Sequence, residues 1–426
     1  MTQLQPLKLW NRSFVVWLLA SAQSQLGTAL AGIALSFLVL HQTGRAGAMA
    51  VTLACSVGPN LLGPLAGAWV DRLPLKVSLI AADVLRGVLQ LTVALLVLRL
   101  GSLPLWVING AALLGGFAGI FAGPAGSAAF PQLVPQGQLA RANGIFGGVS
   151  QGAWLVGTLA GGVLVVTLGP PVAILIDGVS FLLMAALLPL VKLRARETVT
   201  GPRPAIVADM RSGLRLIRRS RTLTLIPCIG LVLNGGLVLV TVVTPKLMEQ
   251  LGPGAAGYGV FLAVESVGAL LGGGLIAWLG NRIPARRASA AGLLGTGLIY
   301  LVMARFTVYP ALLACSLLLG FAFTVLNVPL NTLMQSMVPA AYLGRVFGVL
   351  GTVSTLGMPI TLLLVSPLLD RYPAGLFFAV AGGVQLVGCL LWVLVVRSEQ
   401  VLPDLHAWAK QEGTREVTPD VTAAAD

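Results

Sequence analysis

The sequence is poor in charged residues and in long polar stretches. Of its 426 residues only 10% are charged, whereas 57% are hydrophobic, and the mean hydropathy is +0.92. A water-soluble domain carries about 25% charged residues because its surface faces water, so a soluble globule is excluded. A single membrane anchor with a soluble head is excluded too, because no polar stretch is long enough to form that head.

Cysteine and histidine are also scarce. The four cysteines (Cys55, Cys228, Cys315 and Cys389) each lie within an apolar run, where a thiol acts as a small core side chain. With only two histidines in the chain, we expect no disulfide framework, no metal site and no cofactor. A membrane-embedded enzyme is the weaker alternative, because its chemistry needs a convergent acid, base, nucleophile or metal.

Apolar runs separated by short breaks fill most of the chain. A bilayer core about 30 Å thick needs roughly 20 residues of helix, and on that measure the sequence predicts an all-α membrane protein with twelve transmembrane helices. The expected spans are 14–40, 47–70, 77–98, 104–130, 144–168, 172–191, 223–248, 258–279, 288–305, 310–337, 346–369 and 374–396.

The long internal polar stretch divides these spans six plus six. We therefore expect an N-terminal six-helix bundle over residues 1–191, a linker over 192–222, a C-terminal six-helix bundle over 223–396 and a disordered tail over 397–426. In the linker, Met210, Leu214 and Ile217 recur at helical spacing between arginines, which predicts an amphipathic helix on the membrane surface.

The net charge of +13 is explained by topology. Most of the 27 lysines and arginines fall on the side of the membrane that holds the N-terminus, the linker and the tail. Such residues are retained in cytoplasmic loops, so both termini are expected to be cytoplasmic. The positive charge therefore does not indicate binding of nucleic acid.

Two loop motifs recur in the two halves. After the second and eighth spans the chain reads Gly67-x3-Asp71-Arg72-x-Pro74-x-Lys76 and Ala277-x3-Asn281-Arg282-x-Pro284-x-Arg286. After the fourth and tenth spans it reads Leu139-x-Arg141-x2-Gly144 and Leu343-x-Arg345-x2-Gly348. Both pairs lie on one membrane side and after the same span of each half, which predicts two pseudo-symmetric parallel repeats related by an axis along the membrane normal.

With these motifs the chain resembles the major facilitator superfamily from Trp10 to Arg397. Gly67-x3-Asp71-Arg72 matches its signature between spans two and three, although Pro74 and Leu75 replace a glycine and a basic residue. The segments Ala81-Ala82-Asp83-x2-Arg86, Leu139-Ala140-Arg141-Ala142-Asn143 and Asn327-x3-Asn331-Thr332 are similar to the branch that contains the enterobactin exporter and macrolide efflux proteins.

The resemblance implies alternating access and export of an amphipathic small molecule from a bacterial cell, across its inner membrane. An importer or a lipid flippase on the same fold stays open as an alternative. We expect the exporter to be coupled to protons and to act as a monomer. The loop residues expected to latch the helix ends are Asp71, Arg72 and Lys76 with Gly67, and Asn281, Arg282 and Arg286 in the second copy.

A glycine pattern in the fifth span points the same way. It contains Gly148, Gly157, Gly161 and Gly162, and resembles the glycine signature of drug antiporters except that Thr158 stands where proline is usual. Glycines at these spacings also let helices approach closely, so tight packing alone is an equal alternative.

Ionisable residues inside spans are candidate functional groups because they are costly there. Glu265 lies about 10 Å into the eighth span without a basic neighbour in sequence, so we expect it to carry a proton or bind a cationic substrate; an interhelical hydrogen bond is the alternative. Asp83 and Arg86, three residues apart on one helix face, are expected to neutralise each other as a structural pair, with a direct role in substrate binding as the alternative. Asp177 is expected to be structural, satisfied by water or a nearby serine.

Neutral polar residues are candidates for lining a cavity. In the resembled fold spans one, four, seven and ten face the centre, and interhelical hydrogen bonding is the alternative. The branch also often has an aspartate where this chain has Thr28, so another residue must supply that acid if it is needed. The candidate lining residues are Gln23, Gln25, Asn234, Asn327 and Asn331.

Overall fold

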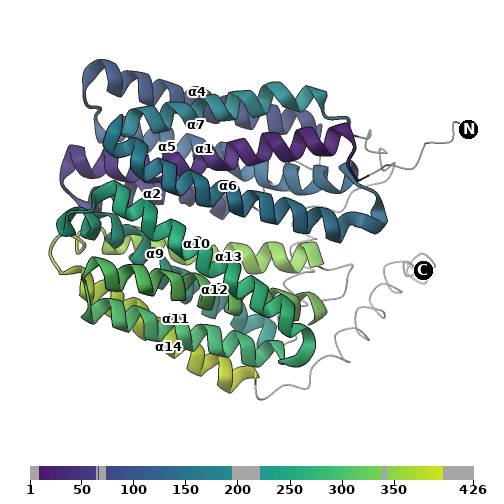
Figure 1. Ribbon diagram of the computed structural model, residues 1–426, viewed down its shortest axis with the longest axis vertical. Coiled ribbons are helices and arrows are strands. Elements are labelled where there is room, and N and C mark those ends of the chain that lie inside the picture. Colours follow the sequence, from purple (N-terminus) through teal and green to yellow (C-terminus); the bar gives the residue numbers. More distant parts are fainter. Residues whose placement is uncertain (1–8, 64–65, 67–72, 194–220, 338–342, 397–426) are drawn as a thin grey trace, which may run out of the picture.

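The computed structural model describes residues 9–63, 66, 73–193, 221–337 and 343–396, which form helices joined by short connections (Figure 1). Most of the expected linker and the whole of the expected tail fall outside these residues, as do Gly67, Asp71 and Arg72 of the predicted latch. Predictions made for those segments therefore stay predictions.

The described helices divide into two sets of six. The first set comprises α1 (Arg12–Thr43), α2 (Ala46–Val57), α4 (Leu75–Leu100), α5 (Leu105–Ala129), α6 (Leu139–Thr167) and α7 (Pro170–Leu187). The second set comprises α9 (Arg221–Leu251), α10 (Gly254–Leu279), α11 (Ala285–Arg305), α12 (Tyr309–Met337), α13 (Leu343–Val365) and α14 (Ala374–Val396).

Ten stretches of the described chain are long and apolar enough to cross a membrane, and two shorter apolar helices cover Ala46–Leu62 and Leu350–Val365. The all-α polytopic fold is thus confirmed. In the second span, α2 ends at Val57 and a 3₁₀ helix follows over Gly58–Leu62 with Pro59 in its first turn. Proline has no amide hydrogen to continue an α-helix.

Local sequence sets the ends of α1. The side chain of Asn11 accepts a hydrogen bond from the amide of Phe14, 3.0 Å away, which satisfies one of the free donors of the first turn. Gly44 ends the helix with φ of 66°, a left-handed conformation that glycine adopts at little cost. The chain then turns directly into α2.

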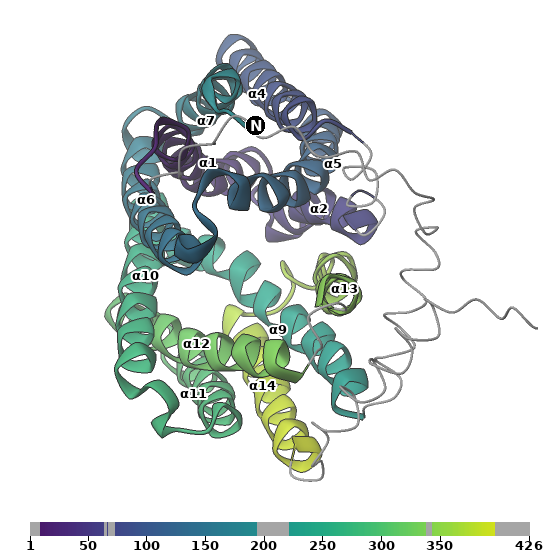
Figure 2. The same cartoon turned by 90° about the vertical axis from the view of Figure 1, so that its right-hand side faces the viewer.

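The same helix pairs pack in both halves. In the first half α1 packs on α6 and α7, while α4 packs on α5 and α7; in the second half α9 packs on α13 and α14, while α11 packs on α12 and α14. Between the halves, α6 packs on α10 and α2 packs on α13 (Figure 2). Helix α2 corresponds to α10 in the other half, and α6 corresponds to α13, so these two contacts are equivalent. A two-fold axis between two copies of one six-helix unit produces such a pair of contacts.

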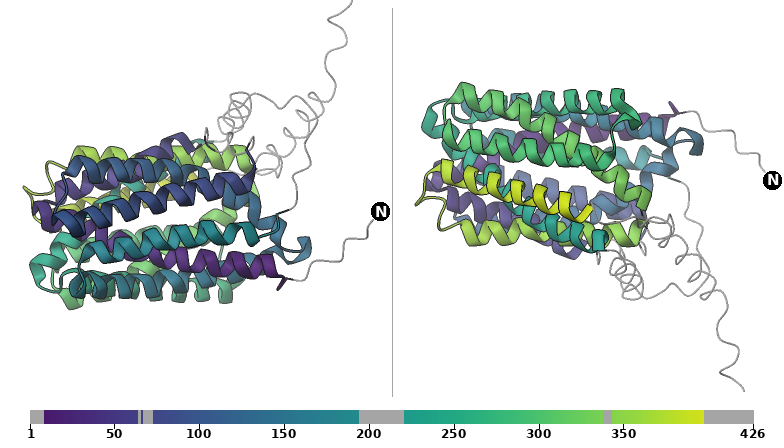
Figure 3. Two further views of the ribbon diagram at one scale, coloured as in Figure 1. Left: turned by 90° about the horizontal axis from the view of Figure 1, so that it is seen from above. Right: turned by 90° about the horizontal axis from the view of Figure 1, so that it is seen from below.

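The helices run side by side, so the molecule has two ends (Figure 3). We call the end where α7 stops and α9 starts the linker end, and the opposite one, where α1 turns into α2, the distal end. The larger cluster of buried apolar residues crosses between the halves and includes Phe37, Val242, Tyr258 and Phe378. A second cluster at the linker end is built from the first half alone, including Phe14 and Leu133.

Glycine allows α6 and α10 to touch near the distal end. A Cβ atom on Gly162 would lie 2.7 Å from the carbonyl oxygen of Ala255 and 3.1 Å from the Cα of Gly259. Both neighbours are backbone atoms that cannot swing aside. Close approach of helix backbones through small residues is a common way to join helices in a bilayer.

We predict that Gly162→Ala destabilises the folded protein by about 1–3 kcal/mol, the usual cost of overpacking. Gly148→Ala is the matched control, because a Cβ atom there has nothing within 4 Å and the same helix gains the same intrinsic preference of about 1 kcal/mol for alanine. Unfolding of the purified protein, followed by helix content in mixed detergent, measures both. Equal stabilities of the two variants would contradict this packing argument.

Candidate functional site

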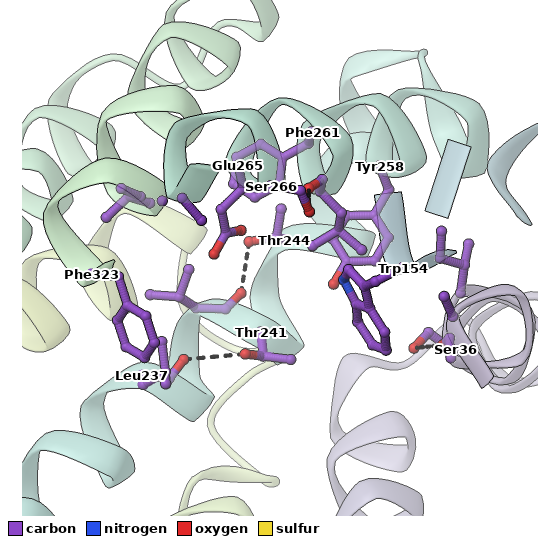
Figure 4. Close-up of a pocket in the computed structure, with 18 of the residues that line it drawn as sticks. Ser36, Trp154, Leu237, Thr241, Thr244, Tyr258, Phe261, Glu265, Ser266 and Phe323 are labelled. Carbon is purple, nitrogen blue, oxygen red and sulfur yellow. Dashed lines mark hydrogen bonds between the residues drawn. The ribbon is translucent and has the colours of Figure 1, made fainter. Parts of the chain in front are cut away.

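A cavity of about 750 Å³ lies between the two halves (Figure 4). The first half contributes side chains from α1, α2 and α6, and the second half contributes them from α9, α10, α11 and α12. Pockets for drug-sized ligands have volumes of roughly 300–1,000 Å³, so this cavity has the size to hold such a molecule.

Glu265 is the one charged residue among the described residues that line the cavity. It is half-buried and projects from α10 into the space between the helices (Figure 4). Because α10 starts at Gly254, earlier than the sequence indicated, Glu265 lies about 16 Å from the start of its helix rather than about 10 Å. It therefore occupies the middle of the helix.

The backbone at Glu265 is held by α12. A Cβ atom on Gly320 would collide with the carbonyl group of Glu265, and one on Gly268 would collide with that of Leu317. The two helices thus meet backbone to backbone at this level. A carboxylate on a rigid element keeps a fixed position relative to whatever enters the cavity.

Aromatic residues line the same cavity as the carboxylate. Trp154 enters from α6, Phe323 from α12, and Tyr258 and Phe261 from α10 itself. Toward the distal end, the rings of Phe37 and Tyr258 lie 6.2 Å apart and join the two halves. Rings attract a cation to their faces, so one carboxylate among several rings suits an apolar molecule that carries one positive charge.

Two helices present lining residues at a regular spacing. On α6 the cavity is lined by Gly147, Ser150, Gln151 and Trp154, and on α9 by Leu237, Val240, Thr241 and Thr244. Both sets follow the i, i+3, i+4, i+7 pattern of one helical face. None of these residues was among the predicted lining residues, which were amides of spans one, seven and ten, whereas α6 is the fifth span and α9 contributes hydroxyl-bearing and apolar residues. A stripe of small and hydroxyl-bearing residues at helical spacing could have revealed the same faces.

Of the five predicted lining residues, one lines this cavity and four do not. Gln25 lines the cavity. Gln23 instead donates to the carbonyl oxygen of Ser180 at 2.8 Å, inside the first half. The other three donate to carbonyl oxygens one turn earlier in their own helices and do not belong to the lining of this cavity; they are Asn234, Asn327 and Asn331.

Asp177 lies in a polar cluster inside the first half, away from the cavity. Its carboxylate accepts from Gln90 at 3.1 Å, from Ser180 at 3.4 Å and from Thr28 at 3.5 Å, and the residue is 1% exposed. The nearby serine was foreseen, but Gln90 and Thr28 come from other helices. Thr28 occupies the position where the resembled branch often has an acid, so Asp177 brings a carboxyl group to that point from α7.

Asp83 and Arg86 are close enough for their charges to attract each other, although they make no direct ion-pair contact. The guanidinium of Arg86 stacks over the ring of Phe181 on α7, 4.2 Å from the ring centroid, and forms no ion pair with Asp83. Both residues come from α4, and the long arginine side chain reaches across to the neighbouring helix, where an aromatic face attracts it. Asp83 is buried, with 6% of its surface exposed.

The described part of the predicted latch makes contacts within each half. Lys76 donates to the carbonyl oxygen of Pro189 at 3.1 Å, which ties the start of α4 to the end of α7. In the second copy, Arg282 lies over the ring of Trp278 with 5.6 Å to the centroid, and the carbonyl of Arg286 accepts from Trp392 at 3.2 Å. Asn281 lies in the short 3₁₀ turn Gly280–Arg282.

The glycines of the fifth span also differ in their surroundings. A Cβ atom on Gly157 would lie 2.7 Å from the carbonyl oxygen of Leu26, and one on Gly161 would lie 3.0 Å from the Cα of Leu30. These two glycines let α6 lie against α1, and Gly162 faces α10 as described above. Gly148 has open space around it.

Comparison with known proteins gives a consistent result. The sequence model of the Major Facilitator Superfamily matches residues 17–359 and 234–419. The multidrug efflux pump Tap of Mycobacterium tuberculosis is 27% identical over 369 residues, covering 83% of this chain and 86% of the pump. Macrolide efflux protein A of Streptococcus pyogenes is 23% identical over 401 residues, covering 92% of this chain and 97% of that protein.

Solved structures show the same fold. The crystal structure of the nucleoside transporter NupG aligns with a TM-score of 0.74 at 9% identity, covering 91% of this chain and all of that one. A bacterial homologue of the iron transporter ferroportin in its inward-facing state aligns with a TM-score of 0.68 at 16% identity, covering 90% of this chain and 98% of that one. At such identities the likeness concerns the fold alone.

The cavity geometry predicts which side of α9 meets water. In a chain whose native cysteines are replaced, we expect Thr241→Cys to react with a charged thiol reagent, because Thr241 is exposed and lines the cavity. Val242→Cys is the control, because Val242 is only 1% exposed. The reaction is measured in sealed vesicles of both orientations, with Lys192→Cys and Ser102→Cys marking the linker and distal ends.

We expect Thr241→Cys to react in the vesicles in which Lys192→Cys also reacts, since the contacts between the halves close the distal end. Reaction of Val242→Cys at a similar rate would contradict the assigned face of α9. Reaction of Thr241→Cys from the side of Ser102→Cys alone would contradict closure at the distal end.

Proposed function

The chain belongs to the Major Facilitator Superfamily, and from this premise we propose that it exports amphipathic organic cations in exchange for protons by alternating access. It is a multi-pass membrane transporter related to efflux pumps, and not an enzyme. The chemistry of the cavity described above indicates which molecule is carried and which ion is coupled to it.

The observation that carries this proposal is the position of Glu265. A single carboxylate stands in a cavity lined by rings, and the described lining offers no basic residue to neutralise it. Burying an unpaired charge is costly, so such a group takes up a proton or pairs with a cation. An anionic siderophore would meet this negative charge without a compensating base, and a positively charged drug would be attracted by it.

Exchange of a proton for an organic cation follows if the carboxylate of Glu265 binds either one of them but not both at once. From the linker side a cation displaces the proton of Glu265 and occupies the ring-lined cavity. After the halves move and the cavity opens at the distal end, a proton binds the carboxylate and the cation leaves. A ligand drives such a change only by binding the two conformations with different affinity, and the state of Glu265 supplies that difference.

We further propose that the linker end is cytoplasmic and that the protein resides as a monomer in a bacterial inner membrane. Support comes from the distribution of basic residues, since Lys76, Arg141, Lys192, Arg282 and Arg286 all lie toward the linker end. Short loops rich in lysine and arginine stay in the cytoplasm. The export direction then runs from the linker end to the distal end.

The transport prediction concerns Glu265→Gln. In proteoliposomes with an imposed pH gradient, we expect this variant to lose gradient-driven movement of tetraphenylphosphonium, because glutamine can neither exchange a proton nor pair with a cation. Glu265→Asp should retain part of the activity. Glu249→Gln is the matched control, since Glu249 is exposed, lies at the distal end and pairs there with His41.

Several outcomes decide between functions on this fold. Undiminished gradient-driven transport by Glu265→Gln would remove this residue from coupling. Movement of a lysophospholipid, but of no organic cation in the panel, would favour a lipid flippase. Uptake toward the linker end, with the same ions, would favour an importer.

The pH prediction concerns binding without transport. Tetraphenylphosphonium should bind the purified wild-type protein more tightly as pH rises, because the proton and the cation compete for the ionised form of Glu265. The dissociation constant should fall up to tenfold for each pH unit over the range in which the residue titrates. Equilibrium dialysis measures this, and Glu265→Gln should give weak binding that does not change with pH. A wild-type affinity that is constant from pH 5 to pH 9 would contradict direct competition.

A further inference from the structure

A group of polar contacts joins the two halves at the distal end. It is centred on Asp370, in the connection between α13 and α14, whose carboxylate accepts from the amide of Ala46 at 2.9 Å and from the amide of Gly47 at 3.1 Å. The hydroxyl of Ser366 donates to the carbonyl oxygen of Gly47 at 3.0 Å. We call these four residues the clasp, because a connection of the second half holds the first turn of α2 in the first half.

Helix α2 lacks a cap of its own. The residue at its N-cap is Arg45, which makes no side-chain hydrogen bond to the first turn, in contrast to Asn11 at the start of α1. The first amides of a helix have no partner within it. Asp370 supplies the missing acceptors from the other half, and its negative charge also interacts favourably with the helix dipole.

The carboxylate is kept ionised by its neighbours. Lys246, at the end of α9, donates to Asp370 at 2.6 Å, and the guanidinium of Arg45 lies 3.7 Å away. Partial burial acts to raise the pKa of Asp370, but the hydrogen bonds from Lys246, Gly47 and Ala46 together with the charge of Lys246 outweigh it and leave that pKa below its ordinary value. The clasp is therefore intact at neutral pH and would loosen only in strong acid.

The groups that bind Asp370 come from both halves of the protein. Lys246 and Asp370 both belong to the second half, so their ion pair survives any movement of one half against the other. The amides of Ala46 and Gly47 belong to the first half, and opening of the distal end must break their bonds to Asp370. When the halves separate, the amides of Ala46 and Gly47 must form hydrogen bonds with water instead, whereas Asp370 keeps its ion pair with Lys246.

We propose that the clasp is the lock of the distal gate, which sets the ratio of molecules closed and open at that end. The proposal rests on the alternating access of the proposed function. The clasp lies outside the cavity and does not include Glu265, so conformation can be read independently of substrate and proton binding.

The test measures distances between spin labels by pulsed electron resonance in a chain with its native cysteines replaced. Labels at Ser102→Cys and Val308→Cys report on the distal end, and labels at Lys192→Cys and Ile283→Cys report on the linker end. All four positions are exposed. In Asp370→Asn we expect the ratio of distal-open to distal-closed molecules to rise roughly tenfold, the size of effect that a charge at a partly buried helix start has.

Two further variants make the result specific. Gly47→Ala should also open the distal end while keeping every charge, because its Cβ atom would collide with the carbonyl group of Ser366. Glu249→Gln should leave the distances unchanged, because Glu249 and His41 are 47% and 49% exposed and exposed ion pairs contribute little.

Wild-type distance distributions in both Asp370→Asn and Gly47→Ala would overturn the proposal. An equal opening in Glu249→Gln would also overturn it, because the effect would then come from general surface charge. Neither result would touch the proposed function, whose failure appears instead as the absence of cation transport in the wild type.

Discussion

The structure depends on the cost of placing one carboxylate inside a membrane. The helices satisfy their own backbone groups, as every segment in a bilayer must, and among the described residues of the central cavity the charged side chain is that of Glu265. Aromatic and hydroxyl-bearing residues line the same cavity, and the described lining offers the carboxylate no base. In the proposed function, this charge is balanced in turn by a proton and by the carried cation, and movement of the two halves gives their exchange a direction.

The architecture could be predicted from the sequence because the helices depend on the composition of short, continuous stretches of the chain. Apolar runs gave the spans and a polar break after Lys192 divided them, and the paired packing of the two sets of helices agrees with the repeated loop motifs. The second span changes from α-helix to 3₁₀ helix at Gly58, and this change was not predicted. Its composition stays apolar past Val57, and only Pro59 marked the change of helix type.

The site was harder to predict, because a side chain's partner is known only once helices are packed. Glu265 stood out by its chemistry alone, whereas Gln23 turned away to Ser180 and Arg86 reached Phe181 on another helix. The lining of α6 and α9 consists mainly of small, hydroxyl-bearing and apolar residues, whose function depends on the face they occupy. The clasp was invisible in sequence, since Asp370 and Gly47 are far apart in the chain and meet through the arrangement of the two halves.

The two related six-helix units belong to one polypeptide, so corresponding positions in them can hold different residues. Two identical chains around a symmetry axis could not differ in this way. At the spacing that relates Asp71 to Asn281, the residue corresponding to Glu265 is Cys55. Two identical subunits around a two-fold axis would repeat every residue and present two acids to one chamber, where like charges disfavour joint ionisation. The difference between the two halves therefore leaves Glu265 as the one charged residue among the described residues of the central cavity.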